Sequence, residues 1–155
     1  MLANSLRTKD RKMSKMLTEH EILQMPESAY MNPAQLAFFN NLLLERGKTL
    51  QHTITELAES LKEITVSPDA CDMASQEESR SKSLRLLDRA NEELRQVRAA
   101  LDRIQNDDYG FCDLSGEPIG IKRLMISPAA RYDTESQRVI EARARTGGAS
   151  QIAYA

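Results

Sequence analysis

Residues 33–64 read PAQLAFFNNLLLERGKTLQHTITELAESLKEI, and their apolar side chains recur every three or four positions. This spacing predicts one long helix with a single apolar seam of the coiled-coil kind. Asn32 is a good N-cap and Pro33 suits the first helical position, so we expect the helix to begin there. Gly47 is its weak point, because glycine costs about 1 kcal/mol relative to Ala inside a helix. The expected seam comprises Leu36, Phe39, Leu43, Gly47, Leu50, Ile54, Leu57, Leu61 and Ile64.

A second helix of similar length is expected after the break at Val66-Ser67-Pro68-Asp69, because residues 69–109 contain neither Gly nor Pro. A short break between two long helices predicts an antiparallel hairpin with arms of roughly 50 Å each, at about 1.5 Å per residue. The stretch 75–83 reads SQEESRSKS and contains no apolar residue. It indicates either a frayed, solvated tip or a polar tip that enters a polar cavity. The expected seam of this helix comprises Leu84, Leu87, Asn91, Leu94, Val97 or Arg98, Leu101 and Ile104.

Charged residues nearly cancel in the chain of 155 residues, with 21 Lys and Arg against 23 Asp and Glu and a net charge of −2. This balance argues against a nucleic-acid coat and against a binder of anionic membranes. No stretch approaches about 18 consecutive apolar residues, and the N-terminus lacks the apolar segment of a secretion signal. We therefore expect a mainly helical, cytoplasmic protein that neither coats nucleic acid nor spans a membrane.

The segment after the hairpin is rich in turns. Gly116-Glu117-Pro118 and Gly120 are turn signals, and residues 119–121 and 123–126 are short β-like pieces. We expect this segment to be compact and held together by packing. Its expected core comprises Ile119, Ile121, Leu124, Ile126, Tyr132 and Ile140.

A last helix is expected from Thr134 to about Arg145, with Asp133 as its N-cap. Val139 and Ile140 are expected to face inward. The predicted organisation is a flexible leader (1–15), a strap that belongs to the globular part (16–32), the hairpin (33–108) with its tip near 66–74, the globular part (109–146) and a loose tail (147–155).

Enzymatic motifs are missing from the sequence, which has no phosphate loop, nucleophile elbow or metalloprotease motif. His20 and His52 lie in different predicted elements, so no catalytic set is predicted. Cys112-x-x-Ser115 and Asp133-x-x-Ser136 have the spacing of a four-ligand zinc ribbon. Only one of these four positions is Cys, and an un-ionised Ser hydroxyl is a poor zinc ligand. We therefore expect no structural metal.

Two carboxylates, Asp69 and Asp72, lie three residues apart at the expected start of the second helix. One of them suits an N-cap and the positive end of the helix dipole. Both together, at the end of a long arm, would form a small exposed acidic point. Such a point can accept hydrogen bonds from Arg or Lys, or disturb a bound divalent ion, inside a partner.

Taken together, these residues resemble the DksA/TraR family of bacterial transcription regulators over about residues 30–145. The most specific pieces are YMNPAQLAFF, PDACDMASQEE, LRLLDR and YGFCDLSGEPIGIKRL. The resemblance implies a mainly α fold, in which a long antiparallel coiled-coil hairpin protrudes from a small globular domain. That domain would hold a degenerate zinc-ribbon-like segment and a C-terminal helix. The Asp-x-x-Asp-x-Ala tip of the family stands here as Asp69, Asp72 and Ala74.

The resemblance also implies a function. Members of the family do not bind DNA. They bind RNA polymerase directly, insert the hairpin into its secondary channel and act near the catalytic centre through the tip. The outcome is a less stable open promoter complex, and the alarmone guanosine tetraphosphate of the stringent response strengthens the effect. For this chain the resemblance implies RNA polymerase as the partner of a monomer, guanosine tetraphosphate as a co-effector, and Arg89 as a polymerase contact on the hairpin.

The sequence departs from the family in two places. Ser115, Asp133 and Ser136 replace three of the four zinc cysteines, so the chain looks like a zinc-independent DksA paralogue. The basic positions of the family's alarmone surface correspond here to Gln96, Ser127 and Gln137. Nearby arginines that could compensate are Arg95, Arg98, Arg131 and Arg138.

Alternative functions stay open at this point. A Gre-like transcript-cleavage factor would use the acidic pair to help hold a catalytic Mg²⁺. A structural coiled-coil adaptor would dimerise through the hairpin without contacting polymerase. A zinc sensor would carry stoichiometric metal.

Overall fold

The computed structural model describes residues 17–63 and 70–150. The predicted leader, the segment 64–69 with the predicted tip residue Asp69, and the last five residues lie outside this range. Within it the order is α1 (Glu19–Leu23), a short 3-10 helix η1 (Glu27–Ala29), α2 (Pro33–Glu63), α3 (Ala70–Gln105), α4 (Ile121–Ile126) and α5 (Thr134–Ser150). The described residues form no strand, and the one isolated bridge among them joins Phe111 to Pro118. The predicted mainly α class is confirmed.

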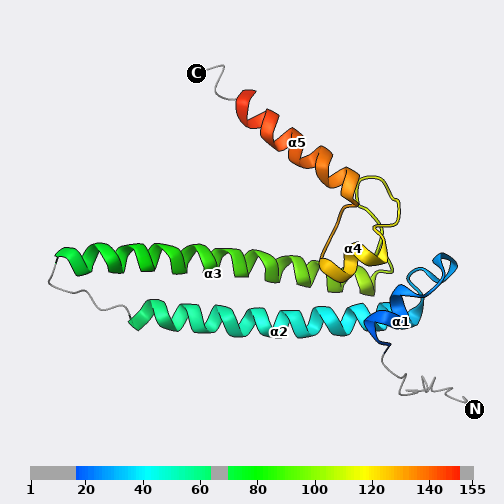
Figure 1. Ribbon diagram of the computed structural model, residues 1–155, viewed down its shortest axis with the longest axis horizontal. Coiled ribbons are helices and arrows are strands. Elements are labelled where there is room, and N and C mark those ends of the chain that lie inside the picture. The colour runs from blue at the N-terminus through cyan, green and yellow to red at the C-terminus, as the bar shows by residue number, and fades with distance from the viewer. Residues whose placement is uncertain (1–16, 64–69, 151–155) are drawn as a thin grey trace, which may run out of the picture.

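The two long helices α2 and α3 lie side by side and antiparallel, as predicted, and form the long arm of the molecule (Figure 1). Helix α2 begins at Pro33, because the Asn32 side chain accepts a hydrogen bond from the backbone N–H of Gln35 at 2.8 Å. The Gln35 side chain in turn accepts a hydrogen bond from the backbone N–H of Met31 at 2.8 Å. The backbone N–H groups of Met31 and Gln35 therefore both have partners at the start of the helix.

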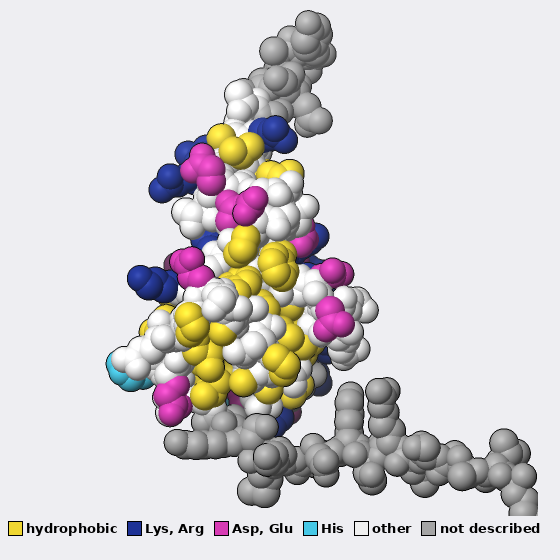
Figure 2. Space-filling view, turned by 90° about the vertical axis from the view of Figure 1, so that its right-hand side faces the viewer, with side chains coloured by type: hydrophobic (Ala, Val, Ile, Leu, Met, Phe, Trp, Pro, Cys, Tyr) yellow, Lys and Arg dark blue, Asp and Glu magenta, His cyan; other side chains and the backbone are white. Residues whose placement is uncertain are grey.

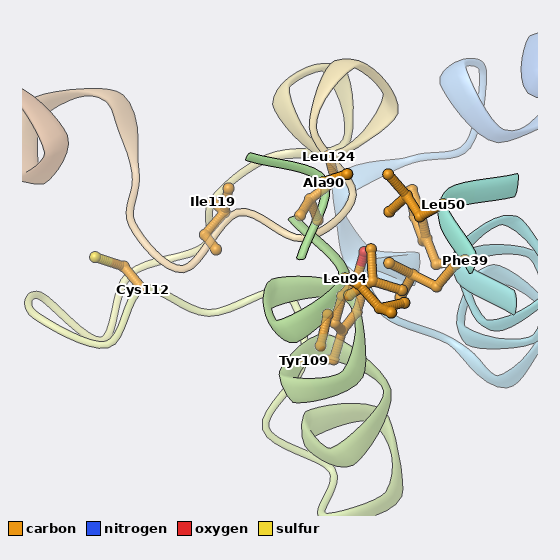
Figure 3. Close-up of a cluster of buried hydrophobic side chains, with 11 residues drawn as sticks. Phe39, Leu50, Ala90, Leu94, Tyr109, Cys112, Ile119 and Leu124 are labelled. Atoms are coloured by element: carbon orange, nitrogen blue, oxygen red, sulfur yellow. The ribbon is translucent and has the colours of Figure 1, made fainter. Parts of the chain in front are cut away.

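Buried residues of the hairpin seam lie toward its base. On α2 they are Phe39, Leu43 and Leu50, and on α3 they are Ala90, Leu94, Val97 and Ala100 (Figure 3). The predicted α3 seam was wrong at two positions, since Leu84 is 43% exposed and Asn91 is exposed. Asn91 instead donates a hydrogen bond to the Leu87 carbonyl at 3.0 Å, while its apolar neighbour Ala90 turns inward.

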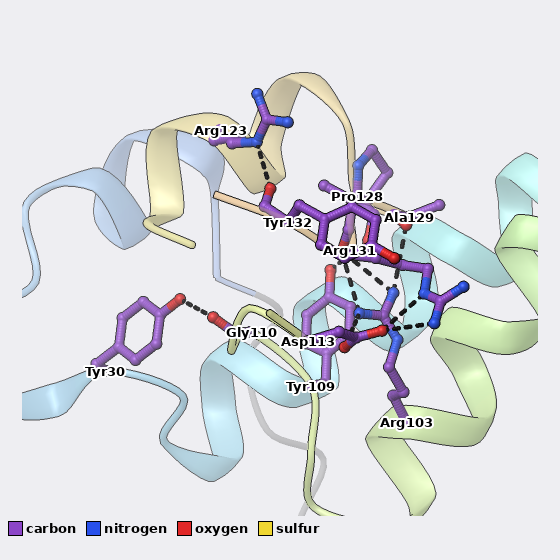
Figure 4. Close-up of polar contacts among 11 residues, drawn as sticks. Tyr30, Arg103, Tyr109, Gly110, Asp113, Arg123, Pro128, Ala129, Arg131 and Tyr132 are labelled. Atoms are coloured by element: carbon purple, nitrogen blue, oxygen red, sulfur yellow. Dashed lines mark hydrogen bonds and ion pairs between the residues drawn. The ribbon is translucent and has the colours of Figure 1, made fainter. Parts of the chain in front are cut away.

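The strap and the globular part close over one end of the hairpin. Ile22 of α1 is 1% exposed, and α1 packs against α4. The Tyr30 hydroxyl donates to the Gly110 carbonyl at 2.5 Å and accepts from the Gly120 N–H at 3.1 Å (Figure 4). Desolvation raises the pKa of Tyr30, so this hydroxyl stays protonated and keeps donating. The bonds tie the strap to a segment about 80 residues away.

Residues 123–126 were predicted as a β-like piece, and the structure shows this prediction to be wrong. They belong to helix α4, which follows Gly120 with φ of 92°. Period 2 would place Leu124 and Ile126 on one face, but in a helix residues two apart point to different sides. Leu124 is therefore 0% exposed, whereas Ile126 is 88% exposed and does not belong to the core.

Helix α5 also differs from its prediction. It is capped by Asp133 as expected, but it runs to Ser150 rather than to about Arg145. Val139 is 36% exposed instead of facing inward, while Ile140 is half-buried. The reason is visible in Figure 1, where α5 leaves the body and only its first turns meet other elements. No helix among residues 17–63 and 70–150 is long and apolar enough to cross a membrane.

Candidate functional sites

The tip end of α3 is a continuous helix that carries the predicted site residue Ala74. The polar stretch from Ser75 to Ser83 is helical and largely exposed, and Ala74 itself is exposed. Asp72 lies in the first turn of α3, while Asp69 lies outside the described residues. The buried seam residue of α3 that lies nearest the tip is Ala90, so Ala74 stands about 24 Å farther out along the helix, at about 1.5 Å per residue.

A concave site lies where the hairpin meets the segment after α4. This cavity has a volume of about 540 Å³. The predicted polymerase contact Arg89 lies on its wall and is exposed. The cavity is lined by Leu42, Arg46, Arg89, Glu92, Glu93, Gln96, Val97, Met125, Ile126, Ser127, Pro128 and Ala129.

The lining charges of this cavity cancel. Arg46 forms an ion pair with Glu93, and Arg89 and Glu92 contribute one charge of each sign. Gln96 and Ser127, two of the three positions that correspond to the family's alarmone surface, line the cavity without charge. On the molecular face in Figure 2, positive and negative side chains are likewise interspersed.

Three of the four arginines that lie near the alarmone positions in the sequence already form ion pairs. Arg95 forms an ion pair with Glu92, and its hydrogen bond lowers the pKa of Glu92. Arg131 forms an ion pair with Asp113 at 2.7 Å, and Arg138 forms one with Glu135 at 3.6 Å.

The four positions with zinc-ribbon spacing lie together and are joined by hydrogen bonds as well as by packing. The hydroxyl of Ser115 donates to Oδ2 of Asp133 at 2.7 Å, and the hydroxyl of Ser136 donates to the same oxygen at 3.0 Å. The backbone N–H of Ser136 donates to Oδ1 of Asp133 at 2.7 Å and caps α5. Cys112 is 3% exposed beside them.

These hydrogen bonds decide the charge state of the cluster. Bonds from Ser136 and Ser115 hold the pKa of Asp133 far below its usual range, because they stabilise the carboxylate. Burial raises the pKa of the Cys112 thiol, but hydrogen bonding with Ser115 and Ser136 outweighs it, so the net direction is downward. We call Cys112, Ser115, Asp133 and Ser136 the carboxylate cluster.

The carboxylate cluster does not suit zinc. A structural zinc site needs four Cys, His or carboxylate ligands in tetrahedral arrangement. Here two of the four groups are neutral hydroxyls, and both donate their protons to the carboxylate. The described residues contain no group of three or more His, Cys, Asp or Glu that could hold a metal ion.

Sequence reasoning missed Arg103, which joins α3 to the globular part. Its guanidinium donates to the carbonyls of Ala129 at 3.3 Å and Ala130 at 3.1 Å, and lies 3.9 Å from the Asp113 carboxylate (Figure 4). It also lies 5.9 Å from the centre of the Tyr109 ring. Desolvation lowers the pKa of Arg103, and Asp113 partly offsets this effect. No local sequence signal distinguishes this arginine from the exposed ones on the same helix.

Comparisons with known proteins agree with this architecture. The family model "DnaK suppressor protein DksA, N-terminal domain" matches residues 35–104, within the hairpin. The RNA polymerase-binding transcription factor DksA of Haemophilus influenzae is 33% identical over 118 residues, or 76% of this chain and 81% of that protein. The protein of the same name from Escherichia coli K12 is 31% identical over 121 residues, or 77% of this chain and 80% of that protein.

A solved structure extends the match beyond the hairpin. The transcription factor DksA2 from Pseudomonas aeruginosa superposes with a TM-score of 0.73 at 40% identity. The match covers 83% of this chain and 99% of that one. From the hairpin, the globular end and these relatives together, it follows that the chain belongs to the DksA family.

Proposed function

We propose that the chain is a transcription regulator that binds RNA polymerase directly as a monomer and does not bind DNA. The observation that carries the proposal is its relation to proteins named RNA polymerase-binding transcription factor DksA, over three quarters of its length. The near-neutral charge, with its interspersed signs, supports a protein partner rather than nucleic acid. The regulator acts by binding rather than by catalysis.

The proposed mode of action is insertion of the hairpin tip into the secondary channel of the polymerase, where Asp69, Asp72 and Ala74 act near the active centre. The arm supports this mode because α3 stays helical for about 24 Å between Ala90, its outermost buried seam residue, and Ala74. The stretch from Ser75 to Ser83 in this outer part of α3 presents only polar groups, which would keep their hydration in a narrow, ion-containing channel. We infer that the tip then destabilises open promoter complexes.

We further propose that the regulator works without zinc. The carboxylate cluster supports this, because its hydrogen bonds link the loop at Ser115 to the start of α5 at Ser136, the two places that zinc would join. In this proposal guanosine tetraphosphate acts as a co-effector that binds at the polymerase interface. Its contribution should be small, since Gln96 and Ser127 are uncharged and three nearby arginines are ion-paired.

Asp72→Asn tests the proposal. The substitution removes one negative charge at the tip and leaves the seam untouched, so folding and polymerase binding should stay within about two-fold of wild type. Inhibition of a stable-RNA promoter should be lost. The measurement is multi-round transcription with purified RNA polymerase in the presence of a metal chelator, with wild type and Asp72→Asn compared.

Two controls accompany this assay. Glu77→Gln removes a charge on the outer part of α3, away from the acidic motif, and should inhibit like wild type. Stalled elongation complexes should show no transcript cleavage with any variant. Lost polymerase affinity of Asp72→Asn would contradict the proposed division between binding and action, and cleavage by wild type would favour the Gre-like function.

A further inference from the structure

The hairpin seam changes character partway along the arm (Figure 1). Among the described residues, the buried seam residue nearest the tip is Leu50 on α2 and Ala90 on α3. Farther out, the outer seam lacks the close packing that holds the base of the hairpin together. The apolar residues of α2 in this outer part are only half-buried, and they are Ile54, Leu57, Ala58 and Leu61.

The register of the two helices is fixed near the base. Gly47 of α2 lies level with Leu94 and Val97 of α3, since a Cβ added at Gly47 would lie 3.6 Å from Val97 and 4.0 Å from Leu94. The helices are antiparallel, so a step toward the tip on α2 corresponds to an equal step back along the sequence of α3. Leu57 is therefore level with residues 84–87.

The α3 side of the outer seam is polar. By the same register, Leu61 lies level with Arg80 and Ser83. These two positions continue the α3 seam, which runs from Ala90 through Leu87 in steps of three and four residues. The apolar stripe of α2 thus faces a guanidinium chain and a hydroxyl at the place where a coiled-coil seam needs a second apolar stripe.

Polar contacts do not replace the missing apolar ones. No ion pair or hydrogen bond joins residues 48–62 of α2 to residues 77–92 of α3, all of which the structure describes. The ion pair between Arg46 and Glu93 lies just on the base side of this stretch. Helix propensity also adds little, because four of the nine residues 75–83 are serine, which favours a helix less than alanine does.

We propose that the arm consists of two cooperative units, and that the outer unit opens and closes while the base stays folded. The outer unit comprises residues 53–62 of α2 and 73–87 of α3. Opening separates the helices beyond Leu50 and Ala90 and unwinds them locally, because short helices without tight packing are marginal in water. The outer end of α3 thereby changes its orientation relative to the globular end. This opening is a property of the free protein and holds whether or not the chain binds polymerase.

Hydrogen–deuterium exchange of the full-length protein, read by mass spectrometry, is the decisive experiment. After correction for intrinsic rates, the amides of residues 76–86 should exchange at least about 100-fold faster than those of residues 92–102. Both stretches are helical in α3, so their backbone hydrogen bonds are alike and the packing against α2 makes the difference. Exchange of the two stretches within about three-fold of each other would overturn the proposal.

Ser83→Leu supplies the missing apolar partner for Leu57 and Leu61. It should slow the exchange of residues 76–86 by about 10-fold, because a leucine buried in the seam stabilises the closed form of the outer unit. The amides of residues 54–62 in α2 should slow by a similar factor, because the two helices of the unit open together. Exchange in the base should stay within about two-fold of wild type.

Ser81→Leu is the matched control. Ser81 lies two residues from Ser83, so its side chain points to a different side of α3, where it accepts a hydrogen bond from Arg85. The control makes the same change in helix propensity without filling the seam, so exchange in both helices should stay within about two-fold of wild type. An equal effect of both variants, or an effect of Ser83→Leu on α3 alone, would mean that the helices fray one by one and would refute the cooperative unit.

Limited proteolysis by trypsin gives a second readout, because cleavage within a helix requires local unfolding. Lys82 lies in the outer unit and Arg98 in the base, and both are exposed. Trypsin should cut after Lys82 well before it cuts after Arg98, and Ser83→Leu should slow the first cut. Cuts at both positions at the same rate would contradict the separate opening of the outer unit.

Discussion

Asp133 joins the loop at Ser115 to the start of α5 through hydrogen bonds. Its two carboxylate oxygens accept three hydrogen bonds, from the hydroxyls of Ser115 and Ser136 and from the backbone of Ser136. The charged form is required, because a protonated carboxyl could not accept all three with equal strength. The hydrogen bonds of the cluster therefore depend on the pH, because they require the ionised carboxylate.

The stability of the protein should fall in acid through this carboxylate. The folded-state pKa of Asp133 lies below its unfolded value of about 3.9, so its contribution is complete above that pH and is lost as the pH falls toward the folded pKa. Asp133→Asn keeps a helix-capping side chain but loses the charge. Its thermal midpoint should be several degrees below wild type at pH 7, and the gap should narrow at pH 3.

Circular dichroism melts at the two pH values measure this difference. Asp102→Asn removes one negative charge from the exposed face of α3 and serves as the control. A gap between wild type and Asp133→Asn that is the same at both pH values would show that the charge of Asp133 has no part in holding the cluster. Chelator should leave the wild-type melt unchanged.

Among the elements, the hairpin depends on how closely α2 and α3 approach. A Cβ added at Gly47 would lie 3.6 Å from Cγ1 of Val97 and 4.0 Å from Cδ1 of Leu94, which is ordinary van der Waals contact. The helices therefore do not require a glycine there for space. Gly110 is different, because its φ is 95° and an added Cβ would lie 2.7 Å from Met31.

Gly47→Ala should accordingly stabilise the protein by about 0.5–1 kcal/mol, since alanine lowers the entropy of the unfolded chain and favours helix. Gly110→Ala, the contrasting variant, should destabilise it by more than about 1 kcal/mol. Urea titration gives both values, provided that the slope of the unfolding free energy against urea stays constant. A destabilising Gly47→Ala would mean that the seam is packed more tightly than these distances indicate.

At the scale of the whole molecule, the cavity at the base of the arm has lining charges that cancel. We expect this charge balance to keep the response to a polyanionic effector small. Gln96 and Ser127 line the cavity, so a double substitution to Lys and Arg would add two positive charges there. We expect the variant Gln96→Lys with Ser127→Arg to show a stronger alarmone response than wild type. Added positive charge attracts the phosphates, and the neighbouring Arg89 reinforces the field.

The measured quantity is the ratio of the half-inhibitory protein concentrations without and with guanosine tetraphosphate, which is insensitive to a change in polymerase affinity alone. Gln51→Lys with Gln105→Arg adds the same charge at exposed positions outside the cavity and should leave the ratio unchanged. An equal response in both double variants would indicate a general effect of net charge rather than a site at the cavity.

The helical hairpin and the Asn32 and Asp133 caps could be predicted from the chain alone. Apolar spacing along a helix and hydrogen bonds between residues three apart are local, so they are already encoded in short stretches of sequence. The tip residues Asp69 and Asp72 come from the motif, and their role stays a prediction.

Contacts between distant segments decided the pairing of buried polar groups, the helical form of α4 and the cavity at the base of the arm. Arg103 reaches Ala130 across 27 residues and Tyr30 reaches Gly110 across 80, and no local pattern shows which polar groups such contacts will pair. The sequence of α4 fits a strand or a helix, and only its packing against α1 shows that Leu124 turns in and Ile126 turns out. The cavity at the base of the arm depends on that choice, because its wall exists only once α4 and the segment after it are placed beside α3.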